Sequence, residues 1–192
     1  MVKALIIIDM FNADVQRRKD KRRLITNQLK LIRAFKKKGY AVILTKGKTG
    51  VSVNPVMKRL WGDEYAGRSK KPEIARREFL HNVAIIGELK QINPDKIISK
   101  REYSAFYKTD LERYCKRHRI DELYFCGISS GCCVYFSAAD AAYRRIQPYL
   151  VTDASGSVNE ARHHKNIDDF RTLLGTTLTT KQVLKQLKTK PS

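Results

Sequence analysis

Three kinds of reactive side chain stand directly after apolar runs of the chain. Asp9 follows "KALIII", Lys100 follows "DKIIS", and the adjacent Cys132 and Cys133 follow "ELYFCGI" and a short cluster of Ser and Gly. A free thiol is only a few per cent ionised at neutral pH, and a base, a positive charge or the N-terminus of a helix activates it. Asp9 has the chemistry of a base, and Lys100 supplies positive charge. Brought together, these residues would form a nucleophilic site.

Each of these residues also has an ordinary structural explanation. An Asp after a strand often forms a turn, a Lys is usually a solvated charge, and a buried Cys is commonly inert. The two cysteines begin a predicted helix at residues 131–145, whose dipole favours a thiolate at either of them. The residues alone therefore predict a thiol enzyme without choosing its nucleophile, and they leave the structural explanation open.

The elements that would position these side chains alternate between strands and helices. We expect strands at residues 3–9, 40–45, 95–99, 122–128 and 147–153, and helices at residues 17–38, 108–120, 131–145, 159–175 and 179–187. The strands are apolar on both sides, which is typical of a parallel sheet covered on both faces and joined by right-handed crossovers. We therefore predict an α/β fold, a three-layer α-β-α sandwich with a mainly parallel, Rossmann-like sheet. In such sheets a site lies beyond the carboxyl ends of the strands, where Asp9, Lys100 and the cysteines stand.

The segment after the second strand is less regular. Residues 46–71 show no sustained period and are expected to form a long loop, and residues 72–92 have mixed helical and strand character. Loops of that length in compact domains are usually functional or mobile. The loop is rich in Lys and Arg and has few acids. If it forms the mouth of a substrate pocket, we hypothesise that this pocket favours an anionic substrate.

Length and composition bound the class of protein. The chain has 192 residues, of which 42% are hydrophobic and 30% charged, as is typical of one globular domain over residues 1–192. The first apolar run ends at Asp9, short of the roughly 18 residues of a membrane span, so we expect a cytoplasmic protein without membrane contact. The four cysteines have neither CxxC nor zinc-ribbon spacing, and we expect them to be reduced.

The charge of the chain is strongly positive. There are 39 Lys and Arg against 19 Asp and Glu, a formal net charge of +20. An excess of this size is expected of a protein that binds a polyanion such as nucleic acid. The basic residues are spread along the chain, however, and the densest stretch, residues 16–39, also has apolar residues at helical spacing. A solvated face of an amphipathic helix explains that stretch, and we favour it over nucleic-acid binding.

The longer motifs resemble a known family. The segments "ALIIIDMFNADV", "SKREYSAFYKTDLERYCKRHRIDELYFCGISSGCCVYFSAADAAYR" and "PYLVTDASGS" are similar, in order and spacing, to the isochorismatase-like cysteine hydrolases, which include nicotinamidase and N-carbamoylsarcosine amidohydrolase. The resemblance runs from the first strand to the last helix, although residues 46–92 match poorly. It implies a catalytic triad of Asp9, Lys100 and Cys133, since Val134 follows Cys133 as in the family's pattern. Cys132 would then pack behind the nucleophile.

The same resemblance implies the chemistry. The Cys133 thiolate would attack the carbonyl carbon of a small amide or carbamoyl compound, ammonia or an amine would leave with a proton from Asp9, and water would hydrolyse the thioester. A cis peptide bond is implied between Ile128 and Ser129, with the backbone N–H groups of Ser129 and Cys133 as an oxyanion hole. No cofactor is implied, and relatives commonly assemble as homo-oligomers.

Departures from the family pattern narrow this expectation. Nicotinamidases bind a metal through an Asp and two His after the second strand, and residues 46–71 contain no His, so we expect no metal. True isochorismatases cleave a vinyl ether and have the triad cysteine replaced, so Cys133 favours amide or carbamoyl hydrolysis. Gly131 stands in place of a frequent acidic residue and Ser130 in place of a Thr, and both changes leave the substrate open.

A small-molecule substrate is the partner that this interpretation favours. Its pocket would be lined by aromatic residues, for which the candidates are Phe11, Trp61, Tyr103, Phe106 and Tyr135. Two other functions stay open at this point. One is polyanion binding on the same fold with a vestigial triad, and the other is hydrolysis of a non-amide bond.

Overall fold

The sheet of this protein is parallel throughout and has six strands. The structure, a computed structural model, describes residues 1–47, 55–56, 59 and 80–189. The strands are β1 (Val2–Ile8), β2 (Ala41–Gly47), β3 (Lys96–Lys100), β4 (Ile120–Ile128), β5 (Gln147–Gly156) and β6 (Thr176–Leu178). Their order in the sheet is β3-β2-β1-β4-β5-β6, and every neighbouring pair is parallel. Chain order reverses at the β1–β4 pair, which is the switch point of a doubly wound sheet.

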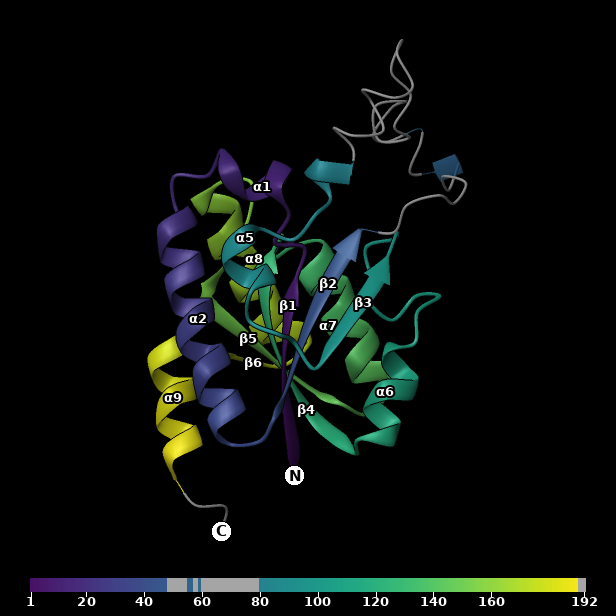
Figure 1. Cartoon of the computed structure of the whole chain (residues 1–192), viewed down its shortest axis with the longest axis vertical. Coiled ribbons are helices and arrows are strands. Elements are labelled where there is room, and N and C mark those ends of the chain that lie inside the picture. Colours follow the sequence, from purple (N-terminus) through teal and green to yellow (C-terminus); the bar gives the residue numbers. More distant parts are fainter. Residues whose placement is uncertain (48–54, 57–58, 60–79, 190–192) are drawn as a thin grey trace.

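Helices cover both faces of this sheet (Figure 1). They are α1 (Asn12–Gln16), α2 (Lys21–Lys37), α5 (Gly87–Lys90), α6 (Leu111–Arg117), α7 (Cys133–Tyr143), α8 (Glu160–Leu173) and α9 (Thr180–Lys188). One hydrophobic cluster joins the sheet to α1, α2, α5 and α9, and a second joins its other face to α6, α7 and α8. The predicted three-layer α/β fold is therefore confirmed.

The central strand β1 shows why its sequence has no polar face. Successive side chains of a strand point to opposite faces of the sheet. Leu5 and Ile7 pack toward α2, whereas Ala4, Ile6 and Ile8 belong to the cluster under α7. Burying each Leu or Ile side chain contributes about 1.5–3 kcal/mol. Both faces of β1 therefore stabilise the fold, and Asp9 is the first polar residue after the strand.

Two short elements were not expected from the sequence. The three residues of β6 pair with β5, and the five residues of α1 lie ahead of α2, which begins at Lys21 within the predicted helix 17–38. Elements this short carry no period that a sequence pattern can reveal. The helix α2 ends at Lys37, and Gly39 just beyond it has a φ of 71°, a conformation that favours glycine. Among the described residues, no helix is long and apolar enough to cross a membrane.

Candidate active site

The carboxyl ends of β1 and β3 bring Asp9 and Lys100 into contact. Lys100 Nζ lies 2.6 Å from Asp9 Oδ2, and Lys100 is 5% exposed and Asp9 6%. Because β2 lies between β1 and β3, the two backbones are separated by two strand spacings, about 9–10 Å. The long stem of a lysine bridges that gap. The Lys100 ammonium also interacts electrostatically and by hydrogen bonding with the Cys133 thiol, so the structure brings all three residues together.

Asp9 is held in place by Thr45, a residue that the sequence analysis missed. The Asp9 N–H donates to Thr45 Oγ1 at 2.8 Å, and the Thr45 hydroxyl donates to Asp9 Oδ1 at 2.6 Å. Asp9 has a φ of 46°, which is uncommon for a residue other than glycine. Each carboxylate oxygen of Asp9 thus has its own donor, Thr45 on one and Lys100 on the other. One feature of the sequence could have identified Thr45. It stands at the end of the second predicted strand, next to the first strand, which Asp9 follows.

Lys100 is a fixed cation in this site. Burial alone would lower its pKa, but the Asp9 carboxylate and the Cys133 thiol act in the opposite direction and raise the pKa above its ordinary value. Lys100 Nζ also donates to the carbonyl oxygen of Glu102 at 3.0 Å. The ammonium therefore keeps its proton at neutral pH, and it can stabilise negative charge but not accept a proton.

Cys133 begins α7 and rests as a thiol. A hydrogen bond with Cys132, burial and the negative charge of Asp9 raise its pKa well above the ordinary value, and only Lys100 acts in the opposite direction. The same hydrogen bond lowers the pKa of the Cys132 thiol. The helix N-terminus was expected to favour a thiolate, but the hydrogen bond with Cys132, burial and Asp9 together raise the pKa of Cys133. A base must therefore remove the Cys133 proton, and the Asp9 carboxylate is beside it.

The turn between β4 and α7 has the expected backbone. The peptide bond between Ile128 and Ser129 is cis. Gly127 before it has a φ of 115°, and a Cβ there would lie 2.1 Å from the carbonyl oxygen of Ile8, so only glycine fits. In the part of the chain that the structure describes, the Ser129 N–H donates to no other backbone group, whereas the Cys133 N–H donates to the Cys132 sulfur. The Ser129 N–H is therefore free to donate to a ligand, and the Cys133 N–H can exchange a weak sulfur acceptor for a ligand oxygen.

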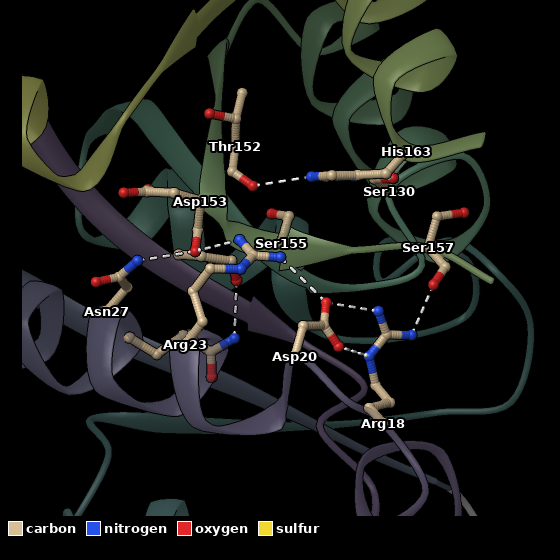
Figure 2. A network of polar contacts seen from close by, with 12 residues as sticks. Arg18, Asp20, Arg23, Asn27, Ser130, Thr152, Asp153, Ser155, Ser157 and His163 are labelled. Carbon is tan, nitrogen blue, oxygen red and sulfur yellow. Dashed lines mark hydrogen bonds and ion pairs between the residues drawn. The ribbon is translucent and has the colours of Figure 1, made fainter. Parts of the chain in front are cut away.

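A buried histidine forms a hydrogen bond with this turn (Figure 2). Ser130 Oγ lies 2.9 Å from His163 Nδ1, and His163 Nε2 lies 3.0 Å from the carbonyl oxygen of Thr152. A carbonyl only accepts, so Nε2 carries the proton and Nδ1 accepts from the Ser130 hydroxyl. Burial lowers the pKa of His163, which keeps the ring neutral.

An asparagine from α8 completes the support. Asn166 Nδ2 donates to Ser130 Oγ at 3.1 Å and to Ser157 Oγ at 3.2 Å, and Ser157 Oγ lies 3.1 Å from Ser129 Oγ. A Cβ on Gly131 would lie 2.3 Å from Asn166 Oδ1. The glycine at position 131 therefore leaves the space that the Asn166 side chain fills.

Charged residues fix the outer end of the same network (Figure 2). Arg18 pairs with both carboxylate oxygens of Asp20 at 2.7 and 2.8 Å and donates to the carbonyl oxygen of Ser157 at 2.6 Å. Arg23 donates to the carbonyl oxygen of Asp153 at 2.9 Å. These contacts connect the start of α2 with the end of β5. They therefore fix the position of Ser157, whose hydroxyl contacts that of Ser129 in the turn.

The aromatic candidates for the pocket have separate partners. Tyr103 stacks on Phe136 with 5.6 Å between ring centroids, and the backbone of Phe11 forms an isolated antiparallel bridge with Ile85. Trp61 lies outside the described residues, as does most of the predicted loop 46–71.

Phe106 and Tyr135 lie against the core rather than in an open space. Phe106 belongs to the hydrophobic cluster under α7, with the Arg144 guanidinium 5.0 Å from its ring centroid, and Tyr135 packs edge-to-face against Phe170. The pocket role of all five aromatic residues stays a prediction. No group of three or more His, Cys, Asp or Glu among the described residues is arranged to hold a metal ion.

Known proteins share both the sequence pattern and the fold. A family model for the isochorismatase domain matches residues 3–182. The phenazine biosynthesis protein PhzD1 of Pseudomonas aeruginosa is 29% identical over 163 residues, which cover 84% of this chain and 73% of that protein. A cysteine hydrolase from Pseudomonas syringae pv. phaseolicola superposes with a TM-score of 0.84 at 19% identity, covering 97% of this chain and 92% of the other. N-carbamoylsarcosine amidase from Thermoplasma acidophilum superposes with a TM-score of 0.76 at 23% identity. The superposition covers 94% of this chain and 97% of that protein.

Proposed function

Since the chain belongs to the isochorismatase family of hydrolases, whose domain model spans residues 3–182, we propose that it is a cysteine hydrolase acting on a small amide or carbamoyl compound. Cys133 is the nucleophile, Asp9 the general base and acid, and Lys100 the fixed cation of the site. One observation carries the proposal, the buried contact of 2.6 Å between Lys100 Nζ and Asp9 Oδ2 beside the Cys133 thiol.

The reaction begins with the resting thiol of Cys133. As its sulfur attacks the substrate carbonyl carbon, the thiol proton passes to the Asp9 carboxylate. The carbonyl oxygen becomes an oxyanion, which the N–H groups of Ser129 and Cys133 stabilise. Removing one such donor in other enzymes lowers the rate by about 10²–10³. Lys100 contacts the Asp9 carboxylate before the transfer and offsets the negative charge that develops on sulfur.

The second half of the reaction returns the site to its starting state. Collapse of the tetrahedral intermediate breaks the C–N bond, and the leaving ammonia or amine takes the proton from Asp9. A thioester between the acyl group and Cys133 remains. Asp9 then takes a proton from water as the oxygen attacks the thioester, and the proton returns to the Cys133 sulfur as the acid product leaves. The sum is an amide and water converted to an acid and an amine.

A substrate panel with two cysteine variants tests the proposal. Primary amides, carbamoyl amino acids and nicotinamide are assayed for ammonia release with the wild type, Cys133→Ala and the matched control Cys132→Ala. We expect Cys133→Ala to lose at least about 10³-fold in kcat/KM, as expected for loss of a nucleophile, and Cys132→Ala to lose less than about tenfold. Mass spectrometry after an acid quench should find the acyl group on Cys133. Equal losses in both variants, or full activity in Cys133→Ala, would overturn the assignment.

Three further features are proposals, each with a test of its own. The family resemblance supports a homo-oligomer, which sedimentation equilibrium measures. A free-thiol nucleophile and four unpaired cysteines support a reducing compartment such as the cytoplasm, which cell fractionation checks. An anionic substrate is supported by the basic sequence of residues 46–71, and activity that does not rise with substrate negative charge would exclude it.

A further inference from the structure

Two helices on one face of the sheet together present only positive charge to solvent. Helices α2 and α9 contact each other (Figure 1), and neither contains an Asp or Glu. We call their outward side the α2–α9 basic face and define it by the exposed residues Arg22, Lys30, Arg33, Lys37, Lys181 and Lys185. These residues lie opposite the buried side of each helix, so both sets point away from the sheet.

The positive charges of this face are not neutralised within the protein. None of its six residues forms an ion pair or a side-chain hydrogen bond with any residue that the structure describes. Basic residues elsewhere do pair, as Lys3 does with Glu122 and Arg144 with Glu112. Solvation of an amphipathic helix requires polar residues but not a single sign of charge, so it does not explain why acids are absent.

The arrangement also works against the stability of the helices. Arg33 and Lys37 are like charges four residues apart on α2, and Lys181 and Lys185 repeat this spacing on α9, which destabilises a helix. The N-cap residue Asp20 places one carboxylate at the start of α2, but it is already paired with Arg18 and Arg23 and does not neutralise the outward stripe. A bound polyanion would relieve the repulsion between the like charges.

The geometry fits a partner that carries its charges in a row. From Arg22 to Lys37 the α2 stripe is about 22 Å long at 1.5 Å per residue. The phosphates of a duplex follow one another every 3.4 Å along the axis of each strand, about 1.7 Å when both strands are counted. The stripe therefore passes several phosphates, and its arginines can bind phosphate oxygens through two N–H groups at once.

Two other polyanionic partners fit less well. A helix that binds a membrane surface inserts apolar side chains into the bilayer, but those of α2 are buried in the core and no exposed large hydrophobic residue lies on α2 or α9. Binding of a single strand uses aromatic side chains as stacking platforms, and the outward positions of both helices have none. We infer that the α2–α9 basic face binds the phosphate backbone of double-stranded nucleic acid without sequence preference.

The test compares two variants that lose the same charge. The face variant carries Lys30→Gln, Arg33→Gln and Lys37→Gln on α2. The control carries Arg113→Gln, Arg117→Gln and Lys165→Gln, which are exposed on α6 and α8 in the opposite layer. Binding to a fluorescent duplex of about 20 base pairs is followed by anisotropy across a salt series. We expect the face variant to bind at least about tenfold more weakly near 0.1 M salt, with a salt slope lower by up to about 2.7.

The control variant should bind within about threefold of the wild type. Thermal melts establish that both variants are folded, and the face variant should keep the wild-type hydrolase activity, because its changes lie outside the candidate active site. Equal weakening of both variants would show that net charge alone is responsible and would overturn the inference. Absence of duplex binding, or binding to phosphatidylserine vesicles in its place, would overturn it as well. None of the binding outcomes depends on whether Cys133 is a nucleophile.

Discussion

The neutral ring of His163 accepts a hydrogen bond from the Ser130 hydroxyl at 2.9 Å, three residues before Cys133. The other ring nitrogen donates to the Thr152 carbonyl oxygen at 3.0 Å, so one tautomer satisfies both contacts. A protonated ring would bring a second N–H toward Ser130, whose oxygen already accepts from Asn166. The charge state of His163 is thereby linked to the turn that presents the Ser129 and Cys133 N–H groups.

This link predicts how stability depends on pH. Burial lowers the pKa of His163 in the folded protein below its ordinary value of 6.5. The stabilisation is therefore complete above pH 6.5 and is lost as the pH falls through the folded-state pKa, because the unfolded chain binds the proton first. His163→Asn keeps an acceptor for Ser130 without this titration. Urea unfolding between pH 4.5 and 7.5 should show a steeper loss at acid pH for the wild type than for this variant, and parallel curves would contradict the assignment.

A second prediction concerns the buried pair of Asp9 and Lys100. Lys100→Gln leaves the Asp9 carboxylate buried without its cationic partner, which should lower the free energy of unfolding by about 3–5 kcal/mol. Adding Asp9→Asn removes the unpaired negative charge of the Asp9 carboxylate, so the double variant should be more stable than Lys100→Gln alone. Chemical denaturation of the three proteins measures this coupling. A double variant at least as unstable as the sum of the single ones would show that the two side chains do not interact.

A third prediction concerns the space beside Gly131. Gly131→Ala places a methyl group on the Asn166 side chain and should force it from Ser130 and Ser157, at a cost of about 1–3 kcal/mol in unfolding free energy. In an Asn166→Ala background the same change meets no side-chain amide, so it should cost far less. Urea unfolding of the two singles and the double tests this non-additivity. Strictly additive losses would mean that the clash lies elsewhere.

A fourth prediction concerns the residue that the sequence analysis missed. Thr45→Val keeps the shape of the side chain but removes the hydroxyl that binds both the backbone and the carboxylate of Asp9. A misplaced base lowers the rate, and we expect kcat to fall by about tenfold to 10²-fold. Thr45→Ser restores the hydroxyl and should recover most of the activity. If the valine and serine variants are equally active, Thr45 does not position Asp9.

The positions of the three reactive residues were predictable because they depend on simple periodic features. Uninterrupted apolar runs identify strands buried on both faces, and parallel strands end at one edge of the sheet. Asp9, Lys100 and Cys133 follow such strands, so their meeting at that edge follows from the order of elements. The choice of Cys133 over Cys132 and the cis bond at Ser129 came from the resemblance of the motif.

The supporting contacts depend on the register between distant segments. Thr45 is 36 residues from Asp9, and His163 and Asn166 are 33 and 36 residues from Ser130. Shifting β2 by one residue would turn Thr45 to the other face of the sheet, and the contacts of His163 and Asn166 depend on how α8 packs beside the turn. No local pattern in the sequence records either choice. The strand β6 is similar, since three residues form a strand only because β5 offers a free edge.

The sequence by itself determined the fold class and which residues reach the edge of the sheet, because hydrophobic periodicity fixes both. Only the tertiary structure decided the state of the site. The hydrogen bond with Cys132, burial and the charge of Asp9 raise the pKa of the Cys133 thiol, whereas a helix N-terminus alone would favour a thiolate. The acid-free face of α2 and α9 appears only when the two helices pack together, because net charge is a sum over the chain and a binding face is an arrangement in space.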